Sequence, residues 1–273
     1  MDDLLQMTSE RATRYLAGLA DRRVGPSPEA VAGLGALAGP LPEGPSDPAD
    51  VLALLDDAGS PATVASAGGR YFGFVTGGSL PAALAANWLA GAWDQNCAFA
   101  VMSPVGAALE EIALEWLRDL LGLPAGCGGG FVTGATMANF TALVAARHAL
   151  LARAGWDVEE DGLFGAPPIT VIGGAEVHVS LLKALGLAGF GRRRVVTVPV
   201  DSQGRMRADA LPRLSGPTIL CIQAGNVNTG AFDPASEICA WAHAAGAWVH
   251  VDGAFGLWAL ADPARARLAA GVT

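Results

Sequence analysis

The second half of the chain alternates short apolar runs with segments of helical length, and this alternation limits the possible fold more than any other feature. The predicted strands lie at 169–172, 194–198, 217–222 and 247–251, and the predicted helices at 137–154, 180–187, 208–214 and 234–245. Strands that alternate with helices of this size form a parallel sheet with helices on both faces and right-handed crossovers. The sequence therefore predicts an α/β fold.

The first half is predicted to be mainly helical. Apolar side chains at helical spacing, with prolines near two of the expected first turns, predict helices at 1–25, 49–58, 80–93 and 104–121. The stretch 26–48 is dense in Pro and Gly and predicts an extended arm. The segment CGGGFVTG, at 127–134, predicts a strand that runs into a turn.

Charge and composition argue against several kinds of partner. The 273 residues include 17 Lys+Arg and 26 Asp+Glu, so the formal net charge is -9 and no basic face is available for nucleic acid or an anionic membrane. No run of about 18 strongly apolar residues predicts a membrane span, and the acidic start MDDLLQMTSERATRYL is unlike a signal peptide. The four cysteines form no CxxC pair, so neither a metal site nor a disulfide framework is predicted. We expect a cytoplasmic protein.

The segment TGATMAN, at 133–139, combines Gly134 with an immediate helix start. Backbone N–H groups at a helix N-terminus, together with the Thr136 hydroxyl, can form a phosphate cradle. The segment lacks the Gly-Lys-Ser/Thr ending of a Walker A loop and the GxGxxG spacing of a dinucleotide site. The alternative interpretation is an ordinary N-cap turn.

The segment HVDGAFG, at 250–256, ends a predicted buried strand with polar side chains. His250 and Asp252 are two residues apart and so point to the same face of the strand. A carboxylate in such a place is costly unless it is paired, and a protonated heterocycle would pair with it. The alternatives are an N-cap for the next segment and a metal pair, for which a third ligand is missing.

Two further turns follow predicted strands. His178 lies in the loop 174–180 and can stack on a flat ligand or serve as a polar surface or capping residue. The segment AGNVNTGAFD, at 224–233, carries side-chain amides and a hydroxyl, and can also be a plain loop. Because ligands of parallel sheets bind at the carboxyl ends of strands, we expect these turns to form one site.

Seven segments, taken in order, resemble the group II pyridoxal-phosphate-dependent amino-acid decarboxylases, a family that includes aromatic-amino-acid, histidine, glutamate and diaminobutyrate decarboxylases. The resemblance runs from about residue 60 to the end, over RYFGFVTGGSLPA, SPVGAALEEIALEWL, VTGATMANFTALVAAR, HVSLLKALGLAG, VDSQGRMRADAL, AGNVNTGAFDP and HVDGAFG. It implies the aspartate-aminotransferase-like fold, called fold type I, with a mostly parallel sheet and helices on both faces. It also implies pyridoxal 5'-phosphate as the cofactor.

The resemblance implies a role for each matching residue. Gly134, Ala135 and Thr136 would hold the cofactor phosphate, and Asn228 would contact the ring substituents or the substrate.

The catalytic residues that the resemblance implies are His178 and Asp252. His178 would lie over the pyridine ring, and Ala254 would lie under its other face. Asp252 would pair with the ring nitrogen and keep it protonated, so that the ring can accept the electrons left on the amino acid's Cα.

The same resemblance implies that two stretches of the chain determine which substrate side chain is accepted. They supply Phe74, Val75, Thr76, Asn96 and Ala98, of which the last two are smaller or more polar than the residues of aromatic-acid decarboxylases. The expected substrate is an L-amino acid, and this departure weakens the interpretation of an aromatic substrate without naming a replacement.

The resemblance also implies a domain organisation. Residues 1–85 would form a helical and extended arm that packs on the partner of a homodimer, and 86–273 a pyridoxal-phosphate-binding large domain that is incomplete at its C-terminal end. The small C-terminal domain would be absent. The family's Schiff-base lysine lies further beyond the HVD aspartate than the 21 residues that follow Asp252 here, and Lys183, the only lysine, lies elsewhere. The chain is expected to be the N-terminal part of a longer or split enzyme and to lack the covalent anchor.

The function that the resemblance implies is decarboxylation of an L-amino acid by a carboxy-lyase. Two alternatives remain. One is another fold type I enzyme, an aminotransferase or a carbon–carbon lyase, because reaction type depends on which Cα bond the site activates. The other is a non-catalytic remnant or one subunit of a split enzyme.

Overall fold

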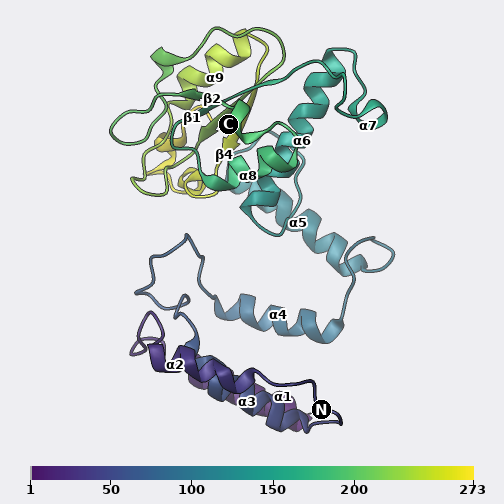
Figure 1. Cartoon of the computed structure of the whole chain (residues 1–273), viewed down its shortest axis with the longest axis vertical. Coiled ribbons are helices and arrows are strands. Elements are labelled where there is room, and N and C mark those ends of the chain that lie inside the picture. The colour runs from purple at the N-terminus through teal and green to yellow at the C-terminus, as the bar shows by residue number, and fades with distance from the viewer. Residues whose placement is uncertain (1) are drawn as a thin grey trace. The chain divides into compact units, whose positions relative to one another are not determined.

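The computed structural model describes residues 2–273 and divides into two compact units (Figure 1). The first unit ends at Asp94 and the second covers Gln95–Thr273. Asp94 follows helix α4 in the left-handed conformation, with φ 48°, and ends that helix. The assignment of an arm to 1–85 and a cofactor domain to 86–273 stays a prediction.

The first unit consists of helices and turns. Its helices are α1 (Asp2–Ala17), α2 (Pro28–Gly33), α3 (Pro48–Gly59) and α4 (Pro81–Trp93), with short 3₁₀ turns at Leu34–Leu37 and Ser60–Ala62. The helices predicted at 49–58 and 80–93 are confirmed, whereas the first helix ends earlier than predicted.

The prediction of an extended arm over 26–48 was wrong where α2 and the 3₁₀ turn form. The Ser27 side chain accepts a hydrogen bond from the Ala30 N–H at 3.2 Å and Pro28 occupies the first turn, which together start a helix. The Pro and Gly content of the stretch concealed this start signal.

The second unit contains the sheet. Its helices are α5 (Pro104–Leu120), α6 (Ala135–Arg153), α7 (Val158–Asp161), α8 (Val179–Leu187) and α9 (Ala235–Ala244), and its strands are β1 (Thr170–Gly174), β2 (Val196–Val198), β3 (Thr218–Gln223) and β4 (Trp248–Asp252). Short 3₁₀ turns lie at Arg192–Arg194, Ala208–Ala210, Leu257–Ala261 and Ala266–Ala269. The predicted helices at 104–121, 137–154, 180–187 and 234–245 and all four strands of the second half are confirmed.

Two predictions in the second unit were wrong. The segment 127–134 has no strand pairing, and the Phe131 N–H instead donates to the Glu110 carboxylate at 3.3 Å. The helix predicted at 208–214 is limited to one 3₁₀ turn over Ala208–Ala210, because Pro212 has no N–H to continue the ladder.

The four strands form one parallel sheet in the order β2-β1-β3-β4. The chain passes from β1 through α8 to β2 on one side, and from β3 through α9 to β4 on the other. The two connections therefore diverge between β1 and β3, and ligands of such sheets bind at the carboxyl ends of the strands at this point of divergence.

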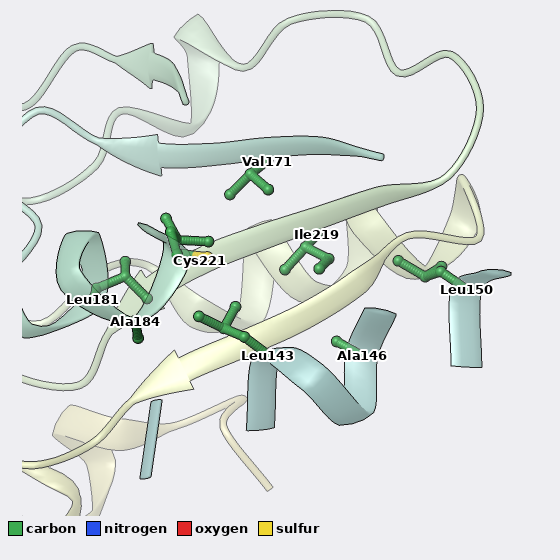
Figure 2. Packing of buried hydrophobic residues seen from close by; sticks show 9 residues of the cluster. Leu143, Ala146, Leu150, Val171, Leu181, Ala184, Ile219 and Cys221 are labelled. Atoms are coloured by element: carbon green, nitrogen blue, oxygen red, sulfur yellow. The ribbon is translucent and has the colours of Figure 1, made fainter. Parts of the chain in front are cut away.

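Both faces of the sheet are covered, because alternate residues of β3 contribute to two different cores. Ile219 and Cys221 pack with residues of α6 and α8, and Figure 2 shows their side chains near Leu143 of α6. Leu220 and Ile222 belong to the opposite core, which includes residues of α9. The predicted parallel sheet with helices on both faces is confirmed.

Over the part of the chain that the structure describes, the helices are too short or too polar to cross a bilayer.

Candidate functional site

The loops that follow β1 and β3 are joined by side-chain hydrogen bonds. The Gln223 side chain, at the end of β3, accepts from the His178 N–H at 3.2 Å and donates to the Glu176 carbonyl at 3.1 Å. The Asn226 amide donates to the Glu176 carboxylate at 3.2 Å. The loops that follow β1 and β3 are therefore held together at the place where ligands of such sheets bind.

Asp252 is the last residue of β4 and is buried, with 9% of its surface exposed. Its Oδ2 accepts a hydrogen bond from the Asn139 amide at 3.1 Å, and its Oδ1 accepts one from the Ala254 N–H at 3.2 Å. The ion pairs found among residues 2–273 do not include Asp252. The buried Asp252 carboxylate thus accepts hydrogen bonds from two neutral donors and has no cationic side chain as a partner among the described residues.

His250 points to the same side of β4 as Asp252, as the strand spacing predicts. Its Nε2 lies 2.7 Å from the Asn139 Oδ1, whereas Val249 and Val251 pack in the opposite core. Burial lowers the pKa of the His250 imidazole, and the negative charge of Asp252 only partly opposes this. The ring is therefore neutral at neutral pH, and its Nε2–H donates to the amide oxygen.

His178 is the N-cap residue of α8. Its Nδ1 accepts from the Ser180 N–H at 3.2 Å and lies 2.8 Å from the Ser180 hydroxyl. The capping role that the sequence offered as an alternative is therefore present. His178 is nevertheless exposed as a residue, so capping leaves ring surface available to a ligand.

The N-terminus of α6 lies close to Asp252. Gly134, with φ 156°, precedes the first helical residue, Ala135, and the described side chains supply no cap to this end. Asn139 follows Ala135 by four residues, a rise of about 6 Å along the helix, and its amide bonds directly to Asp252. The turn 133–139 and the turn 252–256 thus meet at one edge of the sheet.

The turn after β3 is held by a second buried carboxylate, Asp233. Its two oxygens accept from the backbone N–H groups of Met206 and Gln223, both at 2.7 Å. Burial raises the pKa of Asp233, and these two hydrogen bonds oppose that rise. Asn228 of the same turn is exposed, and its N–H donates to the Asn226 side chain at 2.9 Å.

The turns after β3 and β4 touch through their backbones at Gly225. This residue has φ 97°, and a Cβ there would lie 2.8 Å from the Phe255 ring and 3.1 Å from the Gly256 Cα. A side chain at this position would separate the two turns, so the contact requires glycine.

The residues predicted to determine substrate choice are divided between the two units. Phe74, Val75 and Thr76 are exposed in the first unit, where Phe74 and Val75 have positive φ. Asn96 and Ala98 belong to the second unit, and the Asn96 side chain accepts from the Ala98 N–H at 3.0 Å. Their role in substrate choice stays a prediction.

Sequence reasoning missed four side chains that hold the site together: Asn139, Ser180, Gln223 and Asp233. A signal for Asn139 was present. It lies at helical spacing from Leu143, Ala146 and Leu150, which form the apolar stripe of α6. A polar side chain within such a stripe needs a buried partner.

The chain is similar in sequence to known decarboxylases. The model of the pyridoxal-dependent decarboxylase conserved domain matches residues 61–273. L-2,4-diaminobutyrate decarboxylase of Rhizobium meliloti (strain 1021) is 34% identical over 194 residues, which cover 68% of this chain and 37% of the relative. Tryptophan decarboxylase 1 of Oryza sativa subsp. japonica is 31% identical over 208 residues, with 68% and 40% coverage.

A solved structure is similar to this chain over nearly its whole length. The crystal structure of mouse CSAD matches with a TM-score of 0.89 and 26% identity, over 99% of this chain and 58% of that one. The chain thus spans less than two thirds of the proteins that it matches. The match over 61–273 nevertheless covers most of the sequence, and the chain belongs to the family of pyridoxal-phosphate-dependent decarboxylases.

Proposed function

We propose that this chain forms the cofactor-binding part of a decarboxylase that acts on an L-amino acid, with Asp252 at the nitrogen of the pyridoxal 5'-phosphate ring. The observation that carries the proposal is the buried Asp252 carboxylate, which two neutral donors serve and which has no cationic side chain beside it in the described chain. A protonated pyridine ring would supply the missing positive charge.

The other groups at this edge fit the rest of the cofactor. A phosphate would bind at the start of α6, where Gly134, Ala135 and the Thr136 hydroxyl offer donors at the positive end of the helix. The exposed His178 ring and Ala254 would enclose the two faces of the pyridine, and Asn228 would contact its substituents.

The bound cofactor supplies a conjugated ring that takes up the electron pair left on Cα when the carboxylate leaves. Asp252 would hold a proton on the ring nitrogen, because an opposite charge nearby favours the charged form. His178 would fix the ring plane, so that the bond to be broken can stand across it. The named relatives are decarboxylases, and nothing in them favours the aminotransferase alternative.

Three finer features belong to the same proposal. Lys183 is exposed on α8 and would not be the Schiff-base lysine. The whole enzyme would use a lysine that is not among these 273 residues. The exposed apolar side chains of the first unit would pack on a second subunit of a homodimer. The enzyme would act in the cytoplasm.

Binding of pyridoxamine 5'-phosphate to the purified chain tests the cofactor site. This probe carries an amine in place of the aldehyde, so its binding requires no lysine. We expect Asp252→Ala to weaken binding by roughly tenfold to a hundredfold, because a hydrogen bond to a charged group contributes about 1.5–3 kcal/mol. Calorimetric or fluorescence titration would measure the change.

The matched control is Asp209→Ala, which removes a carboxylate that is exposed and paired with Arg207. It should bind the probe like the wild type. Equal affinities of the Asp252 variant and the wild type would contradict the proposal, as would a borohydride-fixed pyridoxal adduct on Lys183 with turnover. For the whole enzyme, release of carbon dioxide rather than formation of a keto acid distinguishes decarboxylation, with 2,4-diaminobutyrate, tryptophan and acidic amino acids as first substrates.

A further inference from the structure

The Asn139 side chain is the centre of a buried polar network that joins α6, α8 and β4. Its oxygen accepts from His250 at 2.7 Å, and its amide nitrogen donates to Asp252 at 3.1 Å and to the Ser180 hydroxyl at 3.2 Å. The residue is 4% exposed. Both amide hydrogens and the amide oxygen therefore have partners, two on β4 (His250 and Asp252) and one on α8 (Ser180).

Asp252 determines which way the Asn139 amide faces. An ionised carboxylate only accepts hydrogen bonds, so the NH₂ group must face Asp252 and the amide oxygen must face His250. The His250 ring, which burial keeps neutral by lowering its pKa, then takes the tautomer that donates through Nε2. An amide turned the other way would place its oxygen against the Asp252 carboxylate.

The amide in turn limits the rotation of the Asp252 carboxylate. Asn139 holds Oδ2 and the Ala254 N–H holds Oδ1, so both oxygens are bound and the plane of the group is set. Asn139 is the only one of these two donors that comes from outside the turn 252–256. The same amide reaches the His178 ring through Ser180, whose hydroxyl lies 2.8 Å from Nδ1.

We propose that Asn139 is a positioning residue that fixes the Asp252 carboxylate in the orientation that meets the nitrogen of the cofactor ring. This inference rests on the proposed function, since it concerns how Asp252 is presented to the ring. Asn139 itself is buried behind Asp252 and acts through it. A fully satisfied buried network of this kind holds its members rigidly.

The test compares two probes on the purified chain: pyridoxamine 5'-phosphate and its analogue with a CH group in place of the ring nitrogen. The ratio of the dissociation constant of the CH analogue to that of pyridoxamine 5'-phosphate measures how much pairing at the ring nitrogen strengthens binding. Both probes share the phosphate and the ring substituents, so other contacts cancel in this ratio. We expect Asn139→Leu, which keeps the volume and removes the amide, to lower this ratio roughly tenfold. Asn139→Ala should lower it in the same direction.

Leu143→Ala is the matched control for general damage. Leu143 lies one turn beyond Asn139 on the buried face of α6 and has no exposed surface, and its truncation leaves the amide network in place. We expect this variant to lose stability and to keep the wild-type ratio within about twofold. Asn139 variants that also keep the wild-type ratio would overturn the inference.

A measurement on the wild type covers the case in which the Asn139 variants do not fold. In a nitrogen-15 spectrum, pyridoxamine 5'-phosphate should shift the Asn139 side-chain amide signals, and the CH analogue should leave them in place. Equal shifts with both probes would contradict the positioning role. A wild-type ratio near one that Asp252→Ala does not change would instead contradict the proposed function itself, so the two failures are distinguishable.

Discussion

The first unit and the sheet unit contain equally clear apolar patterns, but they differ in how much of that pattern is buried. In the described residues up to Asp94, Ala65 alone is buried, and leucines of α3 such as Leu54 and Leu55 remain about half exposed. In the second unit, every residue of β3 is buried. Amphipathic spacing therefore predicts where an element forms, and the presence of a second layer decides whether its apolar face is covered.

Truncation of one leucine in each unit tests this difference in burial with the largest expected effect. Leu220→Ala in β3 should lower the free energy of unfolding by about 2–5 kcal/mol, because the side chain is fully buried and its loss leaves a cavity. Leu55→Ala in α3 should change it by less than about 0.5 kcal/mol, since 55% of Leu55 is exposed. Chemical denaturation gives both values. Equal costs would mean that the α3 surface is covered in solution.

A smaller effect is expected from the buried carboxylate that holds the turn after β3. Asp233→Ala leaves the Met206 and Gln223 N–H groups without their acceptors, and we expect a loss of about 2 kcal/mol. The comparison carboxylate is Asp56 of the first unit, which pairs with Arg11 and Arg14 near the surface. Asp56→Ala should cost at most about 1 kcal/mol. A larger loss from Asp56 than from Asp233 would reverse the expected order of the two units.

The smallest effect concerns pH and His250. Its pKa is lowered in the folded chain, so below the ordinary value of 6.5 the unfolded chain binds a proton that the folded chain does not. Stability should therefore fall as the pH drops below 6.5, by at most about 1.4 kcal/mol per pH unit, until the folded ring titrates. The titratable groups beside it are Asp252, on the same strand, and Cys221, its neighbour on β3.

His250→Gln isolates this contribution, because glutamine can donate to Asn139 and does not titrate. Denaturation curves at pH 7.5 and 5.5 should differ less for the variant than for the wild type. The same loss of stability in both proteins would assign the pH dependence to other groups.

Local patterns predicted most of the elements, because a strand or helix is set mainly by residues near each other in sequence. The strand β3 and the helix α6 followed from such patterns, although α6 begins two residues earlier than predicted. The strand expected within 127–134 did not form, because a strand also needs a neighbour to pair with, and Phe131 bonds to Glu110 instead.

The site was predictable only in part. The spacing of His250 and Asp252 gave the face on which they lie, and the resemblance to a family gave candidate roles. The hydrogen bond between Asn139 and Asp252 joins residues 113 positions apart. Such a contact depends on how the crossovers place α6 against β4, which no local pattern specifies.

The close approach at Gly225 has a consequence for which mutations can damage the site. Gly225 lies against the Phe255 ring and the Gly256 backbone, so an added methyl group would already collide with the turn after β4. A substitution there would therefore disturb the surroundings of Asp252 from a position that donates no hydrogen bond to its carboxylate.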